Sequence, residues 1–220
     1  VYRLVYTEKP LLEPETQAGK PVREVLEQLK SEEWRTRYRV RADLQARPRA
    51  AVLDAAGEWL GSLESDAVPR DVRDRLKTEV LWLQQSFHAV DDGLLRELLE
   101  AETADARGAA TRVLADERDR IAGAEELLVA RATDPHPRVR TEAVRGLSFF
   151  RTSSALAAVM AAANVEPSDR YVAYTADAAL GATIPVWKKD YESGVLTAAG
   201  TPAGRILENV LGLNKKAAEI

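Results

Sequence analysis

The sequence of 220 residues contains no cysteine, only two histidines, and few aromatic residues, which make up 6% of the chain. Without cysteine, the sequence excludes disulfides, thiolate nucleophiles, cysteine-ligated metals and covalent haem attachment through a CxxCH motif. The histidines, His88 and His136, form no HxxxH or HExxH pair. We interpret His136 as a polar turn residue. We interpret His88 as a cation beside the C-terminal carbonyls of a helix, where positive charge is favourable.

Catalytic motifs are missing as well. The sequence has no GxGxxG, GxxxxGK(S/T) or GxSxG segment, so phosphate-binding loops and nucleophile elbows are unsupported. Asp116, Glu117 and Asp119 form an acidic run without a recognisable partner, and we interpret them as solvated surface residues. Because no acid–base or nucleophile–base pair can be named, we assign no catalytic residue, no cofactor-binding residue and no metal ligand. We therefore expect a non-catalytic chain that holds no cofactor and has no small-molecule ligand.

An excess of positive charge is also absent. The net charge is −4 and the pI is near 5.4, which argues against nucleic acid as the main partner. The arginines between residues 35 and 41 lie near Glu32, Glu33 and Asp43, which favours a solvated helix face of mixed sign over a phosphate-binding patch. No apolar run reaches the length of a membrane span. No signal peptide is visible and the first residue is Val, so we expect a piece of a longer protein.

What the sequence does contain is one helix pattern repeated five times. Runs of about ten residues end at Leu44, Leu81, Leu114, Leu147 and Leu180, in steps of 37, 33, 33 and 33 residues. A fixed period of this size indicates stacked units that can bury their apolar faces only against one another. In the last three runs an alanine lies four residues before the leucine, where a small side chain lets the facing helix approach closely. The pattern predicts an all-α, right-handed α-solenoid of about five helical hairpins.

The organisation along the chain follows from this pattern. Residues 1–8 (VYRLVYTE) resemble a single short strand because β-branched and aromatic residues roughly alternate there. Ser31, Asp91, Ser168 and Thr201 are expected to cap helices. We predict helices over residues 21–30, 33–47, 49–63, 70–88, 92–101, 104–118, 123–133, 136–150, 153–164, 168–182, 185–192 and 202–213. The expected parts are a strand and linker that end a preceding domain (1–20), the solenoid (21–183) and helices leading to a following domain (184–220).

One segment carries a family resemblance. The sequence ATDPHPRVRTEAVRGL resembles a HEAT repeat in its aspartate, its proline-containing turn, its Val-Arg pair and its spaced Ala and Leu, at Asp134, Pro135, Val139, Arg140, Ala143 and Leu147. The arginine recurs as Arg37 and Arg107 but is replaced by Asp74 and Ala173 in the second and fifth runs. The resemblance implies that this arginine bonds the neighbouring inter-helix turn and fixes the stacking angle, which suits its planar fork of donors. Docking of a partner carboxylate is the minority interpretation.

A narrower resemblance covers most of the chain. In order, the segments VYRLVYTEKP, SEEWRTRYRVRADL, LWLQQSFHAVDDGLLRELL and DPHPRVRTEAVRGLSFFR are similar to large planctomycete-type (PVC-type) proteins. Those proteins join a β-propeller like that of sorbosone dehydrogenases to HEAT repeats and a haem-binding cytochrome c domain. The resemblance implies a periplasmic scaffold that links or docks such domains. The alternative is part of an oxidoreductase, a sugar dehydrogenase with c-type haem electron transfer, whose catalytic residues lie outside this chain. A HEAT-type lyase or DNA-repair enzyme is a weaker alternative, because the expected acidic or basic groove is not evident.

The expected partners are neighbouring domains or protein subunits, and side chains that could contact them are few. Tyrosine and arginine are enriched in binding hot spots, and Tyr38, Tyr171 and Tyr174 flank arginines; for these three, surface docking and structural packing remain equally open. Trp59 and Trp82 lie in apolar stripes, which favours core packing. The candidate interaction residues are Trp34, Arg37, Tyr38, Trp82, Arg107, Arg140, Tyr171 and Tyr174.

Overall fold

The computed structural model describes residues 2, 8, 14–63 and 68–212. Every regular element in this part of the chain is helical. The expected strand over residues 1–8 lies outside the described residues, apart from Tyr2 and Glu8. The helices are α1 (Val22–Glu27), followed by a 3-10 turn (Gln28–Lys30), α2 (Trp34–Gln45), α3 (Arg49–Ser62), α4 (Arg70–Ser86), α5 (Asp92–Leu99), α6 (Ala104–Asp116), α7 (Ala124–Arg131), α8 (Pro137–Leu147), α9 (Ser153–Ala163), α10 (Arg170–Ala182), α11 (Ile184–Glu192) and α12 (Pro202–Val210).

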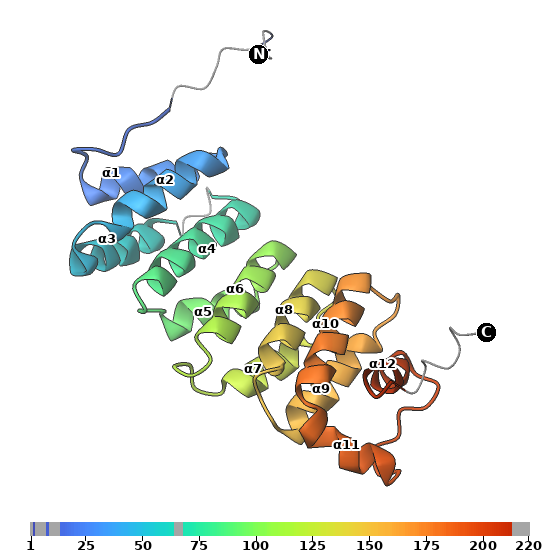
Figure 1. Cartoon of the computed structure of the whole chain (residues 1–220). Helices are drawn as coiled ribbons and strands as arrows, with labels where there is room; N and C mark the ends of the chain where they lie inside the picture. Colours follow the sequence, from blue (N-terminus) through green and yellow to red (C-terminus); the bar gives the residue numbers. More distant parts are fainter. Residues whose placement is uncertain (1, 3–7, 9–13, 64–67, 213–220) are drawn as a thin grey trace.

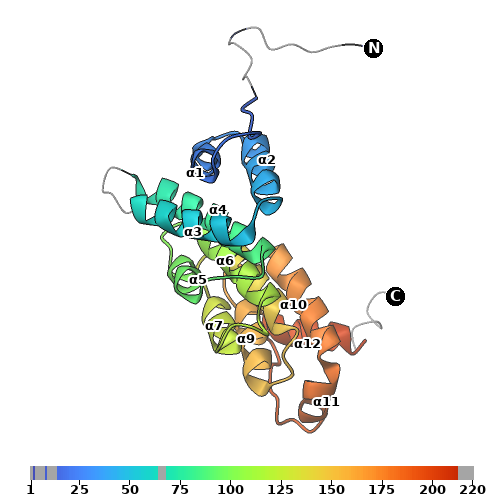
Figure 2. The same ribbon diagram turned by 90° about the vertical axis from the view of Figure 1, so that its left-hand side faces the viewer.

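The helices form five consecutive hairpins that stack along one axis (Figure 1). In each hairpin the first helix lies in one layer and the second helix in the other; Figure 2 shows α5 and α7 on the side of the stack opposite to α10. We call α1, α3, α5, α7 and α9 the first helices, and α2, α4, α6, α8 and α10 the second helices. Within the second layer α8 packs against both α6 and α10. The predicted α-solenoid is therefore confirmed.

The repeating leucines form the interior of this stack. Leu44, Leu81, Leu114, Leu147 and Leu180 each lie on a second helix, and each is at most 1% exposed. Burying a leucine side chain contributes about 1.5–3 kcal/mol relative to leaving it in water. The period in the sequence thus reports one buried position in every hairpin.

The position four residues before each leucine is buried in all five second helices. Val40, Ala110, Ala143 and Ala176 are inaccessible to solvent there. The second hairpin instead carries Lys77, which is also buried and forms an ion pair with Glu97 of α5. In the second hairpin a buried ion pair thus takes the place of the small apolar side chain found at this position in the other second helices.

Glycine allows α6 and α8 to approach each other closely at Gly146. A Cβ atom at Gly146 would lie 2.8 Å from the Cβ of Ala115 and 2.9 Å from a methyl group of Leu128. Real Cβ atoms essentially never come this close. Gly146 therefore fixes the separation of these two helices.

Two of the four expected helix caps are confirmed. The carboxylate of Asp91 accepts from the N–H of Leu94, and the hydroxyl of Thr201 accepts from the N–H of Gly204. The prediction for Ser168 is wrong by one residue, because Asp169 caps α10. A carboxylate there accepts from two N–H groups and also interacts favourably with the positive end of the helix dipole.

The prediction for Ser31 is also wrong. The hydroxyl of Ser31 accepts from the N–H of Glu33, which directly precedes α2. Ser31 therefore belongs to the turn between the 3-10 segment and α2. Its carbonyl oxygen accepts a hydrogen bond from Arg37 instead, so the residue serves the inter-helix turn rather than the helix end.

The last two helices cover the end of the stack beyond α10. α12 packs against α9 and α10, while α11 lies beside α9 (Figure 1). Trp187 of α11 is fully buried, and its indole N–H donates to the carbonyl of Leu180 at 2.9 Å. The side-chain oxygen of Asn164 accepts from the N–H of Ala203 at 2.9 Å. α11 and α12 thus bury the outer side of the fifth hairpin.

Candidate functional site

Three arginines at equivalent positions fasten the second helices to the turns before them. Arg37, Arg107 and Arg140 each lie seven residues before a repeating leucine. In each case Nη1 donates to the carbonyls of the residues five and six positions earlier, at 2.8–3.0 Å. These carbonyls lie in the turn of the same hairpin. The bonds agree with the structural interpretation of these arginines.

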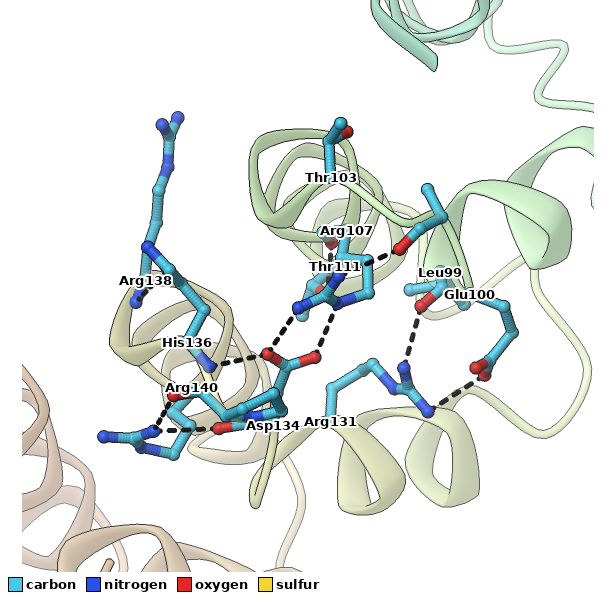
Figure 3. A network of polar contacts seen from close by, with 12 residues as sticks. Leu99, Glu100, Thr103, Arg107, Thr111, Arg131, Asp134, His136, Arg138 and Arg140 are labelled. Atoms are coloured by element: carbon cyan, nitrogen blue, oxygen red, sulfur yellow. Dashed lines mark hydrogen bonds and ion pairs between the residues drawn. The ribbon is translucent and has the colours of Figure 1, made fainter. Parts of the chain in front are cut away.

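The rest of the guanidinium group connects one hairpin to the next. Nε and Nη2 of Arg107 bind the two carboxylate oxygens of Asp134 at 2.8 and 3.0 Å, as Figure 3 shows. In the first hairpin, Nε of Arg37 binds Oε1 of Glu79 at 2.9 Å. Arg131 adds a further link, donating to the carbonyl of Leu99 at 2.8 Å. The bidentate pair between Arg107 and Asp134 combines strength with a defined orientation.

Asp134 is buried, and its environment still favours the ionised form. Burial alone would raise the pKa of this carboxyl group. The hydrogen bond from Arg107 and the N–H of His136 oppose that effect, together with the positive charges of Arg107 and Arg131. The net result is a pKa below the usual value for aspartate. The pKa of Arg107 is raised in turn, mainly by its hydrogen bond to Asp134.

The side-chain links from one hairpin to the next that Arg37 and Arg107 form are not repeated at Arg140. Arg140 is 3% exposed, and its Nε has no hydrogen-bond partner. Pro167 stands one period after Asp134, so the fifth hairpin offers no carboxylate at that point. In the second hairpin Asp74 replaces the arginine, and its carboxylate accepts from the N–H and hydroxyl of Thr103. The residue seven positions before the repeating leucine therefore joins the next hairpin in the first three hairpins, with different partners each time, and does not do so at Arg140.

The predicted aromatic residues lie on the surface at the two ends of the second layer. Trp34 and Tyr38 are exposed on α2, and Tyr171 and Tyr174 are exposed on α10. Tyr38 and Tyr174 both lie six residues before a repeating leucine, so they occupy equivalent positions in the first and fifth hairpins. These two groups are separated by three hairpins.

Trp82 lies in a groove between α4 and α6, where the two helices contact each other less extensively than α6 and α8 do. The groove has a volume of about 410 Å³, within the range of ligand-binding pockets. Thr78, Ala106 and Ala109 are buried small residues along it. Its charged lining consists of Arg37, Asp71, Arg75, Glu79, Asp105 and Arg138.

Arg138 reaches this groove from the neighbouring hairpin. Two of its side-chain carbons lie 3.5 and 3.6 Å from where a Cβ of Gly108 would be, which is ordinary van der Waals contact, so Arg138 packs directly beside α6 at Gly108. Its Nη1 forms an ion pair with Asp105 at 2.9 Å. Arg75, Asp105 and Arg138 are not among the candidate interaction residues predicted from the sequence. The repeat could have indicated Arg75, because Arg75 lies six residues before Leu81, the position that Tyr38 and Tyr174 have in the first and fifth hairpins.

Arginine and aromatic side chains stack on each other at the groove. Arg41 lies over the ring of Trp82 with its central carbon 5.3 Å from the ring centroid, and Arg41 also pairs with the buried Glu79. Within residues 14–63 and 68–212, no three His, Asp or Glu side chains are grouped in a way that could hold a metal ion. In the same residues, no helix combines the length and apolar character needed to cross a bilayer.

The arrangement of stacked hairpins places the protein among the α-solenoids. More specifically, residues 92–181 match the family described as HEAT repeats. Among solved structures, the chain is similar to an engineered protein determined by the Northeast Structural Genomics Consortium. The two share 21% identity over 88% of this chain and 97% of that one, with a TM-score of 0.48. No curated protein sequence gives a significant match.

Proposed function

We propose that this chain is a non-catalytic HEAT-repeat scaffold that binds a protein partner through its second helices. One observation carries the proposal: four large exposed aromatic residues and the groove around Trp82 lie on that layer. The described first helices expose no large hydrophobic residue. HEAT repeats usually mediate protein interactions, and stacked repeats create extended surfaces suited to them.

The partner is a neighbouring domain or subunit of a larger protein. The ordered resemblance to planctomycete-type dehydrogenase proteins supports a β-propeller and a cytochrome c domain as those neighbours. On this proposal any haem and all catalytic residues belong to the other domains, this chain holds no cofactor, and the whole protein resides in the periplasm. The alternative assigns the chain to an oxidoreductase as one of its structural parts. An absorption spectrum of the whole protein, with or without a Soret band, tests the haem-bearing neighbour.

Photo-crosslinking tests the binding face. A photoreactive phenylalanine analogue replaces Tyr38 or Tyr174 on the second layer, and matched variants carry it at Glu58 or Glu126, which are exposed on first helices. We expect a discrete protein adduct from the first two positions in the cells that produce the protein. Adducts only from Glu58 and Glu126, or equally from all four positions, would reject the second layer as the binding face.

A further inference from the structure

The two layers of the solenoid carry opposite charge. The second helices contain 14 Lys and Arg against 8 Asp and Glu, a net charge of +6. The first helices, with the 3-10 turn that follows α1, contain 5 Lys and Arg against 8 Asp and Glu, a net charge of −3. The chain as a whole has a net charge of −4. The positive charge is thus concentrated on the layer that also exposes the aromatic residues.

Arginines and aromatic rings are interleaved on this layer. Arg35 lies over Trp34 and Arg170 lies over Tyr171, with 5.7 and 4.6 Å from guanidinium carbon to ring centroid. Stacked guanidinium groups of this kind keep donors available at their edges. On such a surface an arginine that can bind a carboxylate and an aromatic ring that can make an apolar contact are adjacent residues.

At the groove, one arginine forms an exposed ion pair with a carboxylate of the same chain, and a carboxylate from a partner could take the place of that carboxylate. Asp105 pairs with Arg138, but the side chain of Asp105 is 86% exposed and that of Arg138 is 58% exposed. An exposed pair contributes little to stability, so a carboxylate from outside can replace Asp105 at small cost. Arg75 lines the same groove, and its hydrogen bonds to the carbonyls of Leu29 and Lys30 are long, at 3.3 and 3.4 Å.

We propose that the second layer binds an acidic polypeptide segment. The segment lies across the second helices, with a carboxylate at Arg138 and Arg75 and an apolar or aromatic side chain in the groove beside Trp82. Charge complementarity selects an acidic partner. A peptide is favoured over nucleic acid because Asp71, Asp105 and Glu142 interrupt the positive surface. A continuous phosphate backbone would meet each of these carboxylates, whereas separate peptide carboxylates can avoid them.

This inference rests on the proposed function and specifies its partner. The probe is a fluorescein-labelled peptide that repeats Asp-Glu-Gly-Phe three times, titrated with the whole chain and followed by fluorescence anisotropy. The comparison probes repeat Asn-Gln-Gly-Phe and Lys-Arg-Gly-Phe, and a single-stranded DNA of similar charge is the fourth. We expect the acidic peptide to bind most tightly and its affinity to fall as salt increases.

The variants locate the site. Arg138→Glu is expected to weaken binding of the acidic peptide about tenfold, the size of effect of one charge-assisted hydrogen bond. Arg49→Glu on α3 makes the same change in net charge on the first layer and should leave binding nearly unchanged. Circular dichroism verifies that both variants fold.

The proposal is overturned if the acidic peptide does not bind, if the neutral or basic peptide binds equally well, or if the two variants behave alike. Tighter binding of the DNA would replace the peptide by nucleic acid. Crosslinks from Tyr38 and Tyr174 to a protein would remain valid in each of these cases, so the scaffold proposal and the acidic partner fail separately.

Discussion

Arg107 shows how single residues hold this stack together. Its guanidinium group binds two carbonyls of its own turn and both oxygens of Asp134 in the next hairpin. Arg140 repeats the bonds to its own turn but has no carboxylate beside its Nε. The position seven residues before the repeating leucine thus has two roles, which are to fasten a turn and to join neighbouring hairpins. Arg107 performs both roles, whereas Arg140 performs only the first.

Removing the two arginines should have unequal effects. Arg107→Met leaves the buried carboxylate of Asp134 without its partner, and we expect a loss of about 3 kcal/mol in unfolding free energy. Arg140→Met removes bonds to carbonyls only, with an expected loss of about 1 kcal/mol. Urea denaturation of both variants measures the difference. Equal losses would show that the inter-hairpin ion pair adds nothing to the turn bonds.

The low pKa of Asp134 makes stability depend on pH. Because its pKa is lower in the folded chain than in the unfolded chain, the unfolded chain binds the proton first as the pH falls. The stabilisation is complete above the ordinary aspartate pKa of about 3.9 and is lost as the pH falls through the folded value. The stability gap between the natural chain and Asp134→Asn should therefore shrink below pH ~4. A gap that is constant with pH would contradict the assignment.

At the scale of elements, the repeat pattern predicted the helices well because each hairpin buries the same leucine. All twelve expected helices are present, and the alanines at 110, 143 and 176 are buried as expected. The predicted cap at Ser168 was wrong because the carboxylate of Asp169 accepts from the first N–H groups of α10, and the predicted cap at Ser31 was wrong because Ser31 lies in the turn two residues before Glu33, the residue at the N-cap of α2. The groove between α4 and α6 could not be predicted, because it depends on how far apart two helices pack. A period in sequence does not encode that distance.

Gly146 provides a test of helix packing. Gly146→Ala places a methyl group 2.8 Å from Ala115, and we expect a loss of about 1–2 kcal/mol despite the higher helix propensity of alanine. Gly57→Ala in α3 meets no atom within 4 Å and should raise stability by up to about 1 kcal/mol. Thermal or urea unfolding of the two variants should thus shift in opposite directions. A stabilised Gly146→Ala variant would mean that α6 and α8 are not held at this separation.

On the scale of the whole molecule, stacking along one axis gives an extended shape with α1 and α12 at opposite ends (Figure 1). A compact domain of this length has a radius of gyration of about 17 Å. We expect small-angle X-ray scattering to give a larger value and a distance distribution skewed toward long distances. A symmetric distribution with a radius of gyration near 17 Å would contradict the extended stack.

The same shape gives the second helices one continuous surface that carries the exposed aromatic residues, the groove and the excess of positive charge. Binding through this surface is the central claim, and hydrogen exchange of the whole chain with its crosslinked partner tests it most directly. We expect slower exchange at the exposed ends and outer turns of α2, α4, α6, α8 and α10 when the partner is bound, and unchanged exchange in α3, α5, α7 and α9. Slower exchange in the first helices with no change in the second helices would contradict the claim.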